Sequence, residues 1–197
     1  YFQSNFTKNF SLMNVGTTQM ESYKKLIKSF YKKNDFLVDC GCGVGHFCNL
    51  FDKKNYIGIE INNSFIKLAK LNNPKYIFDN FKGNKINKFK NQIHSVLINN
   101  VIHHLSKKDL ASIFLYIKKK TNKKKIKILI IEPLIPKNFF SFEFFLKVMD
   151  IGDYMTDYTG YLSRLEKYVF IKQKKIVRFE ANRYFKSSNL VIKGFLK

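Results

Sequence analysis

An apolar run leads directly into a glycine-rich loop in Phe36-Leu37-Val38-Asp39-Cys40-Gly41-Cys42-Gly43-Val44-Gly45-His46-Phe47. The pattern predicts a strand over Phe36–Cys40, then a loop, then a helix that begins near His46. Glycines suit such a loop because they adopt positive φ angles and let the backbone approach a bound molecule. The G-x-G-x-G spacing differs from that of a dinucleotide fingerprint and from that of a P-loop. Asp39 beside the loop disfavours a pyrophosphate and favours a cation or an amino group.

Apolar runs and helical patterns alternate along most of the chain. The predicted strands are Phe36–Cys40, Tyr56–Glu60, Tyr76–Asp79, Ser95–Asn99 and Ile126–Glu132, and the predicted helices are Glu21–Tyr31, Ser64–Leu71 and Asp109–Lys120. Asn80–Gln92 has weak periodicity, so a poor helix or a loop is expected there. Near the end, Ile176–Phe185 and Leu190–Leu196 flank a Lys186–Asn189 turn, which predicts an antiparallel hairpin. This order predicts an α/β fold with a mostly parallel sheet that the hairpin closes.

Length and composition predict one domain with its own core. The chain has 197 residues, of which 45% are hydrophobic and 16% are aromatic, so a core can form without disulfides or metal. The expected domain covers residues 5–197, with an N-terminal segment (5–35), a central part with the glycine loop (36–136), an insert (137–170) and the closing hairpin (171–197). Residues 1–4, Tyr-Phe-Gln-Ser, resemble a protease-site remnant from recombinant expression.

The cysteine spacing and the hydropathy of the chain indicate in which cellular compartment the protein is expected. Cys40, Cys42 and Cys48 lack the paired spacing of a zinc site and are expected to be buried thiols, which favours a cytoplasmic protein. The longest apolar stretch, Ile128–Pro136, contains Glu132 and is far below the roughly 20 residues of a membrane-spanning helix. No signal peptide, membrane span or metal cluster is therefore expected.

Acidic residues end several of the predicted parallel strands: Asp39, Glu60, Asp79 and Glu132. In open α/β sheets, small molecules bind outside these carboxyl ends, although an acid there can instead cap the following helix. Glu60 follows Asp39 by 21 residues, a spacing that suits a carboxylate bound to both hydroxyls of a ribose. Asp79 and Asn80 are then placed to meet an adenine edge. The pattern predicts a ligand with a ribose, an adenine and a positive charge.

At these residues the sequence resembles the class I S-adenosylmethionine-dependent methyltransferases. Asp39-x-Gly41-x-Gly43-x-Gly45 matches the first motif of that family, Glu60 its ribose-binding acid, and residues 99–105 (Asn-Asn-Val-Ile-His-His-Leu) the stretch after its fourth strand. The resemblance covers Glu21–Pro136 closely, and the hairpin resembles the family's reversed last strand. It implies a Rossmann-like, doubly wound sheet of seven strands, one of them antiparallel. It also implies S-adenosylmethionine as methyl donor, S-adenosylhomocysteine as product, and these donor-binding residues: Asp39, Gly41, Gly43, Gly45, Glu60, Asp79, Asn80 and Asn99.

The same resemblance implies that the acceptor lies beyond the fourth strand. His103 and His104 are there and are candidates for a catalytic base, although histidines at this place also serve packing or bind the donor's carboxylate. Within the insert, Asp150–Met155 suggests a lid, and the candidate acceptor-side residues are Asp153, Tyr154 and Tyr158. An amphipathic helix with Phe142, Phe145 and Leu146 facing inward is expected before the lid. The Asn/Asp-Pro-Pro-Tyr tetrad of enzymes that methylate exocyclic base amines is absent after the fourth strand.

A formal net charge of +22 raises nucleic acid as a partner. However, three of the 36 basic residues are arginines, which leaves 33 lysines, and phosphate-binding surfaces favour arginine. Many of the lysines precede predicted strands and would lie at the sheet edge opposite the donor. We therefore expect a methyltransferase that acts on a small or medium-sized acceptor. Two alternatives stay open: an RNA methyltransferase that uses the basic surface, and an inactive module that binds S-adenosylmethionine.

Overall fold

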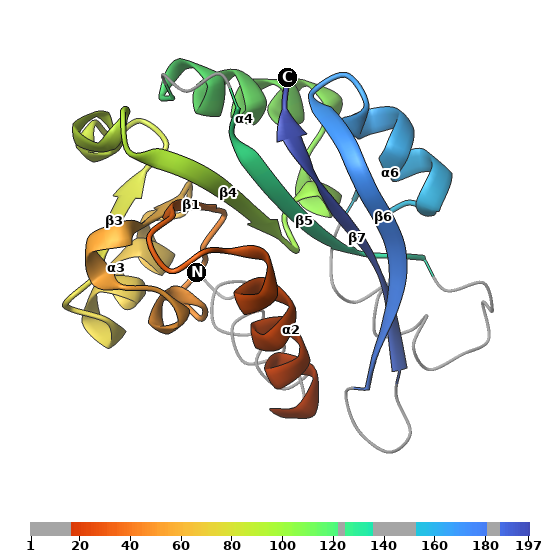
Figure 1. Cartoon of the computed structure of the whole chain (residues 1–197), viewed down its shortest axis with the longest axis horizontal. Helices are drawn as coiled ribbons and strands as arrows, with labels where there is room; N and C mark the ends of the chain where they lie inside the picture. Colours follow the sequence, from red (N-terminus) through yellow and green to blue (C-terminus); the bar gives the residue numbers. More distant parts are fainter. Residues whose placement is uncertain (1–16, 122–124, 136–152, 181–185) are drawn as a thin grey trace.

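The computed structural model describes residues 17–121, 125–135, 153–180 and 186–197. The described strands form one seven-stranded sheet in the order β3-β2-β1-β4-β5-β7-β6 (Figure 1). Their bounds are β1 Phe36–Cys40, β2 Tyr56–Glu60, β3 Ile77–Asn80, β4 Ile93–Asn99, β5 Lys127–Pro133, β6 Val169–Glu180 and β7 Lys186–Leu196. Strands β1 to β5 pair in parallel, and β7 runs antiparallel to both β5 and β6. This arrangement confirms the predicted Rossmann-like sheet with an antiparallel last strand.

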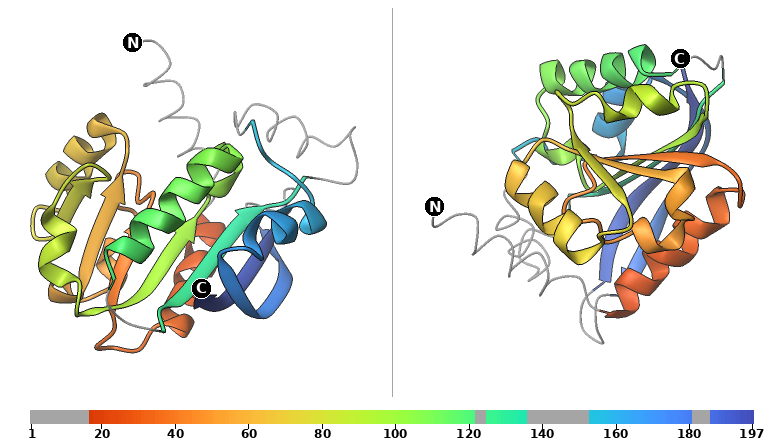
Figure 2. Two further views of the ribbon diagram at one scale, coloured as in Figure 1. Left: turned by 90° about the horizontal axis from the view of Figure 1, so that it is seen from above. Right: turned by 90° about the vertical axis from the view of Figure 1, so that its left-hand side faces the viewer.

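Helices cover both faces of the sheet (Figure 2). One face packs against α4 (Lys107–Lys119), α6 (Tyr158–Leu165) and the 3-10 helix η3 (Lys85–Phe89). The other face packs against α2 (Thr17–Phe30) and α3 (Asn63–Asn72). Because successive side chains of a strand point to opposite faces, both sets of strand residues are buried, as in other parallel sheets.

Element positions agree with the sequence-based prediction over most of the chain. The five predicted parallel strands and the helices predicted over Glu21–Tyr31, Ser64–Leu71 and Asp109–Lys120 are all present. The bounds of Phe36–Cys40 and Tyr56–Glu60 are exact, and the others differ by at most four residues. The largest difference is at α2, which begins at Thr17 rather than Glu21. The weakly periodic Asn80–Gln92 segment contains η3 and no α-helix, as its composition predicted.

The predicted helix near His46 is wrong. The glycine loop continues through turns into two short 3-10 helices, η1 (Cys48–Leu50) and η2 (Lys53–Asn55). Only residues 41–55 connect β1 to β2, and the glycines take the first part of this connection. Phe47 then turns inward, where its ring lies 6.4 Å from that of Tyr23 on α2. Helix α2 therefore covers the surface that a crossover helix would otherwise bury.

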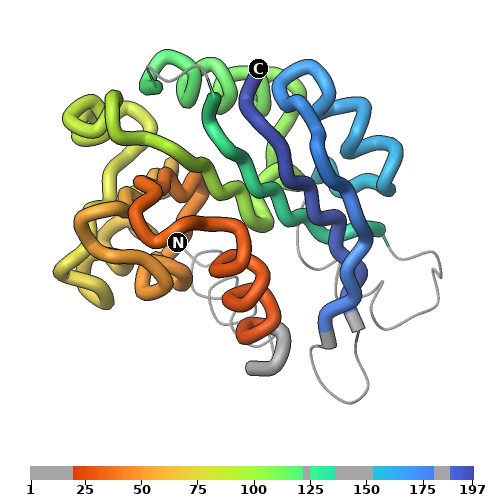
Figure 3. The backbone as a smooth tube through the Cα atoms, in the orientation of Figure 1, coloured from red at the N-terminus to blue at the C-terminus, as the bar shows by residue number. Residues whose placement is uncertain are grey.

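The hairpin is confirmed, but its predicted turn at Lys186–Asn189 is wrong. These residues belong to β7 and pair with β6, with Ser188 opposite Arg178; the connection, residues 181–185, lies outside the described residues. Asn189 is buried and its side chain accepts a hydrogen bond of 3.0 Å from the Tyr23 hydroxyl. This tertiary partner outweighs the turn preference of a Ser-Ser-Asn sequence. Figure 3 shows β6 and β7 as a long two-stranded ribbon at one edge of the sheet.

Part of the insert after β5 lies outside the described residues. These are residues 136–152, so the expected amphipathic helix with Phe142, Phe145 and Leu146 and the first part of the expected lid are not described. The chain is described again from Asp153, which leads into α6. In the described ranges, no helix has the length and apolarity needed to cross a membrane.

Candidate active site

The glycine loop leaves β1 at the carboxyl edge of the parallel strands. Gly41 and Gly43 have φ angles of 77° and 54°, values that only glycine adopts without strain. A Cβ on Gly41 would lie 2.4 Å from Cγ2 of Val101, whereas a Cβ on Gly43 would meet nothing within 4 Å. Gly45 lies against the Phe78 ring of β3. The loop is thus packed tightly at both ends and borders open space at Gly43.

Glu60 connects the glycine loop to the end of β2. One carboxylate oxygen, Oε2, accepts a hydrogen bond of 3.0 Å from the Gly43 amide. The other, Oε1, accepts from the amides of Ile61 (2.8 Å) and Asn62 (2.9 Å). The side chain is 8% exposed. Each carboxylate oxygen has two lone pairs, so Oε2 retains acceptor capacity toward the open space beside Gly43.

Asp39 is buried at the end of β1, 2% exposed. Its Oδ2 accepts a hydrogen bond of 2.8 Å from the hydroxyl of Tyr56, the first residue of β2. Burial raises the pKa of Asp39 to about 7, the Tyr56 hydrogen bond opposes this shift, and the charge of Glu60 adds to it. The site therefore holds a carboxyl group whose charge is costly unless a cation compensates it.

The raised pKa of Asp39 makes folding stability depend on pH. From pH 5 to pH 7 the native Asp39 keeps a proton that the unfolded chain has lost, so the free energy of unfolding falls as pH rises. The titration of Asp39 is expected to lower the free energy of unfolding by about 3 kcal/mol between pH 5 and pH 8. Urea unfolding of the ligand-free protein at several pH values measures this. Asp39→Asn, whose amide oxygen still accepts from Tyr56, should lose this part of the pH dependence; an unchanged profile would contradict the assignment.

Asp79 and Asn80 lie together at the end of β3. Asp79 Oδ2 accepts a hydrogen bond of 2.8 Å from the Lys85 amide. Asn80 Nδ2 donates to the Ile61 carbonyl and to Asn63 Oδ1, both at 3.0 Å. These contacts fix the turn after β3 against the turn after β2. The predicted adenine-side residues therefore lie beside the turn that follows Glu60.

The end of β4 presents two amide oxygens without a partner. Asn99 Oδ1 and Asn100 Oδ1 are buried and have no hydrogen-bond partner within the described residues. Asn100 also has a φ angle of 55°, which is uncommon outside glycine. Buried acceptors in proteins are normally satisfied. Two unsatisfied acceptors are therefore adjacent in sequence at the end of β4, whereas the other unsatisfied buried groups among the described residues are the hydroxyls of Tyr116 and Tyr161.

Glu132 of β5 holds the turn that follows β4. It is fully buried, and it accepts hydrogen bonds from the amides of Val101 (2.9 Å) and Ile102 (2.8 Å) through Oε1. Its Oε2 accepts from the His103 amide at 3.3 Å and lies 2.8 Å from His103 Nδ1. Glu132 is thus fully engaged by groups of the protein itself.

The two predicted histidines differ in environment. His103 is 1% exposed, and its ring is held by Glu132. His104 is exposed, and its ring centroid lies 3.9 Å from that of His103. Both belong to the 3-10 helix η4 (Ile102–His104). Since only the second imidazole is accessible, His104 is the one that can meet a molecule at this edge.

Tyr154 and Arg164 connect the region before α6 to the same edge. The Tyr154 amide donates to the His103 carbonyl at 3.0 Å. Arg164 donates to the carbonyls of Tyr154 (3.0 Å), Ile102 (3.3 Å) and Leu105, and its guanidinium lies 5.9 Å from the centre of the Tyr154 ring. Asp153 is exposed next to Tyr154. The structure therefore brings predicted acceptor-side residues to the histidines.

Tyr158 has a different setting from the other two acceptor-side candidates. It begins α6, is partly buried against the core and lies under Lys174 of β6, whose Nζ is 5.8 Å from the ring centre. Its described contacts are thus with the core and with Lys174 rather than with His103 or His104.

Sequence reasoning missed several residues that shape this edge. Val101 fills the space over Gly41, Asn100 supplies the second unpartnered oxygen, and Arg164 joins three carbonyls. The sequence did contain an indication of the role of Arg164. Arginine is rare in this chain, with three arginines against 33 lysines, and the planar guanidinium group of arginine can donate to several acceptors at once. The described residues contain no group of three or more His, Cys, Asp or Glu side chains arranged to hold a metal ion.

Comparisons with known proteins agree with this geometry. Residues 31–144, more than half of the chain, match a family model described as a methyltransferase domain. A curated relative, the uncharacterized protein MJ0638 of Methanocaldococcus jannaschii, is 34% identical over 146 residues, which cover 70% of this chain and 60% of that protein. The chain thus spans about 60% of that relative's length.

Solved structures share the fold at low sequence identity. An S-adenosylmethionine-dependent methyltransferase from Aquifex aeolicus aligns with a TM-score of 0.65 and 13% identity, over 97% of this chain and 98% of that one. A second, from Methanosarcina mazei, aligns with a TM-score of 0.64 and 14% identity, over 86% and 96%. The matched family model, the strand order and the glycine loop lead to one conclusion. The chain belongs to the methyltransferase domain family, among the class I S-adenosylmethionine-dependent methyltransferases.

Proposed function

We propose that this protein is an enzyme that transfers a methyl group from S-adenosylmethionine to a small or medium-sized acceptor. One observation carries the proposal: the open space at Gly43 and the unpartnered oxygens of Asn99 and Asn100 lie at the sheet edge that also carries His104 and Tyr154. Val101 packs on Gly41, and the carbonyl of His103, two residues further along the chain, accepts a hydrogen bond from the Tyr154 amide. A donor cradle and an acceptor surface are thus adjacent through one short backbone segment.

The residues present fit S-adenosylmethionine. Glu60 would hold the ribose through the free capacity of Oε2, and Asp79 with Asn80 would face the adenine. Asp39 supplies a carboxyl group whose ionisation a cationic ligand favours, and the oxygens of Asn99 and Asn100 are acceptors for an ammonium group. When bound, S-adenosylmethionine supplies an activated methyl group on a sulfonium.

At the acceptor side, the chain orients the substrate and takes up a proton. We assign His104 as the base because it is exposed and an imidazole titrates near neutral pH. His103 is then a positioning residue, since Glu132 holds its ring and this ring lies 3.9 Å from that of His104, tilted by 45°. Tyr154, 43% exposed, offers an aromatic surface to the acceptor. Alignment of the reacting groups in such a site contributes roughly 7 to 11 kcal/mol to catalysis.

Gly43→Ala tests the donor cradle. The new methyl group meets no protein atom within 4 Å, so the ligand-free protein should lose only the roughly 1 kcal/mol cost of a left-handed alanine. We expect S-adenosylhomocysteine to bind about 30-fold more weakly, or about 2 kcal/mol, because the methyl group occupies ligand space. Calorimetry and urea unfolding measure the two effects separately. Binding within threefold of the parent would show that the ligand does not lie at Gly43.

His104→Ala tests the acceptor side. Tritiated methyl groups from S-adenosylmethionine are followed into separate panels of hydroxylated or aromatic small molecules, total RNA and protein. Label is expected in the small-molecule panel, and His104→Ala should lower turnover about 100-fold while S-adenosylhomocysteine affinity stays within twofold. Asn49→Ala, at an exposed position on η1, is the matched control. Label in RNA or protein alone would refute the small acceptor; donor binding without any label would refute the enzyme.

A further inference from the structure

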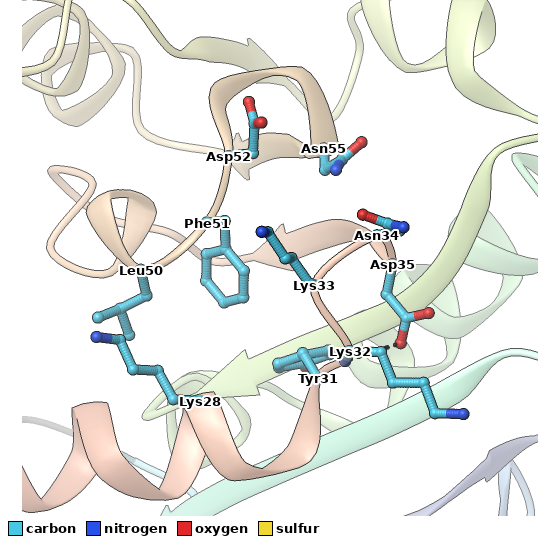
Figure 4. Close-up of a pocket in the computed structure, with 10 residues that line it drawn as sticks. All are labelled: Lys28, Tyr31, Lys32, Lys33, Asn34, Asp35, Leu50, Phe51, Asp52 and Asn55. Atoms are coloured by element: carbon cyan, nitrogen blue, oxygen red, sulfur yellow. Dashed lines mark hydrogen bonds between the residues drawn. The ribbon is translucent and has the colours of Figure 1, made fainter.

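A second hollow lies at the opposite, amino edge of the sheet (Figure 4). It has a volume of about 230 Å³ and lies between the end of α2 and the connection from β1 to β2. Its lining residues are Lys28, Tyr31, Lys32, Lys33, Asn34, Asp35, Leu50, Phe51, Asp52 and Asn55. Since these residues precede β1 and β2, the hollow is separate from the donor cradle, which lies where the parallel strands end.

Aromatic rings form the floor of this hollow. The Phe51 ring is directed into it (Figure 4) and is supported from behind by Tyr56, with ring centroids 5.7 Å apart and an interplanar angle of 21°. Tyr31 meets Phe51 edge to face at 5.5 Å, and its hydroxyl donates to the Val96 carbonyl at 3.0 Å. These contacts hold Phe51 in place as a surface on which a planar group can stack.

Lysine ammonium groups border the aromatic floor. In Figure 4 the Lys33 side chain runs toward Phe51, the Lys28 side chain runs toward Leu50 on the other side of the ring, and Lys32 is directed away. Within the described residues, no hydrogen bond or ion pair engages the ammonium group of Lys28 or Lys33. Lys53 and Lys54 of η2 are exposed nearby.

The acids of the hollow are already engaged. Asp35 pairs with Lys127, and this hydrogen bond lowers the pKa of Asp35 against the opposing effect of burial. Asp52 accepts from the Lys54 amide at 2.9 Å and caps η2. Asp35 is thus neutralised by Lys127, whereas Asp52 keeps its charge. The two positive charges of Lys28 and Lys33 exceed that single negative charge, so the net charge around the hollow is positive, which suits a phosphate group.

Two amide side chains complete the lining. Asn34 and Asn55 face each other on one side of the hollow (Figure 4), and within the described residues neither side chain makes a hydrogen bond. An amide offers a donor and an acceptor together, the combination that pairs with the edge of a nucleobase. Stacking surface, base-edge partners and free cations are thus present in one place.

We propose that this hollow binds a nucleoside phosphate, with the base on Phe51, its edge at Asn34 and Asn55, and the phosphate at one of the two lysines that border the ring, Lys33 or Lys28. The volume is below the roughly 300 to 1,000 Å³ that encloses a whole drug-sized ligand, so the base enters and the sugar-phosphate part projects toward the lysines. Aromatic rings combined with a basic groove are the means by which proteins hold nucleotide units without a deep pocket. The site holds either a free nucleotide or one unit of a single strand.

Equilibrium binding in the absence of methyl donor tests the proposal on the whole chain. The probes are the four nucleoside 5′-monophosphates and fluorescein-labelled single-stranded octaribonucleotides of each base. Lys28→Gln/Lys33→Gln should weaken the tightest probe about tenfold and reduce its salt dependence, and Asn34→Ala/Asn55→Ala should reduce preference among bases. Lys67→Gln/Lys70→Gln, which removes the same charge from exposed positions of α3, should change binding less than twofold.

The outcomes separate the ligand sources and the competing explanations. Monophosphates that bind as tightly as the octamers identify a free nucleotide, and octamers that bind alone identify a strand unit; both support the site. The proposal is overturned if no probe binds below about 1 mM, if the Lys67/Lys70 control loses as much affinity, or if inorganic tripolyphosphate displaces the probes as well as a nucleotide does. S-adenosylhomocysteine titrations of the same variants report an intact fold and test the donor site independently.

Discussion

Glu60→Ala is expected to weaken S-adenosylhomocysteine binding about 1,000-fold. The variant removes the carboxylate assigned to the ribose and, with it, the hydrogen bond from the Gly43 amide that shapes the loop. Hydrogen bonds to a charged group contribute roughly 1.5 to 3 kcal/mol each. Loss of the bond to the ribose and of the Gly43 bond that shapes the loop therefore costs about 4 kcal/mol of binding free energy, which corresponds to a roughly 1,000-fold higher Kd. Isothermal titration calorimetry measures it directly.

Two variants keep this result interpretable. Glu60→Gln retains one acceptor oxygen for Ile61 and Asn62 but turns an amide nitrogen toward the Gly43 N–H, so an intermediate loss of about 30-fold is expected. Glu21→Gln removes the same charge from an exposed position on α2 and should bind within twofold of the parent. If Glu60→Ala binds as tightly as the parent, Glu60 does not hold the ribose.

Glu132→Ala is expected to destabilise the protein by about 4 kcal/mol, because it leaves a buried set of donors without an acceptor. The three amides of residues 101–103 and the ring of His103 would lose their partner at a position with no solvent exposure. For a chain of this size, that loss lowers Tm by roughly 8 to 16 °C. Urea unfolding and differential scanning calorimetry provide the two measurements.

A matched pair of variants separates the buried contacts from the loss of a charge. Glu166→Ala removes an exposed carboxylate after α6 and should change stability by less than about 0.5 kcal/mol. His103→Asn keeps a donor for Glu132 and should cost clearly less than Glu132→Ala. An unfolding midpoint for Glu132→Ala equal to that of the parent would show that these hydrogen bonds contribute nothing to folding.

Local patterns were sufficient for most of the sheet and for the donor half of the site. Apolar runs marked β1 to β5, because a strand buried on both faces needs apolar residues at nearly every position. The glycine spacing and the acids Asp39 and Glu60 could be assigned to one edge, because parallel strands end at the same edge. The helix near His46 could not be judged locally, since α2 packs against Phe47 from a segment more than twenty residues earlier.

The acceptor side shows the same division between local and distant information. His103 and His104 are adjacent in sequence and cannot be distinguished by their sequence context. In the structure, His103 is buried because its ring pairs with Glu132, whereas His104 is exposed. The position of Tyr154 depends on Arg164 and on the His103 carbonyl. A sequence pattern does not contain these pairings, because each joins residues from different elements.

The fold class, the glycine loop and the acids beside it follow from short stretches of sequence, since apolar periodicity and glycine spacing are local properties. Which polar groups find a partner within the protein depends instead on how distant segments pack together. Glu132 meets His103 across 29 residues, Arg164 meets Leu105 across 59, and Tyr23 meets Asn189 across 166. Burial makes these contacts necessary, because a buried polar group must find its partner wherever the folded chain provides one.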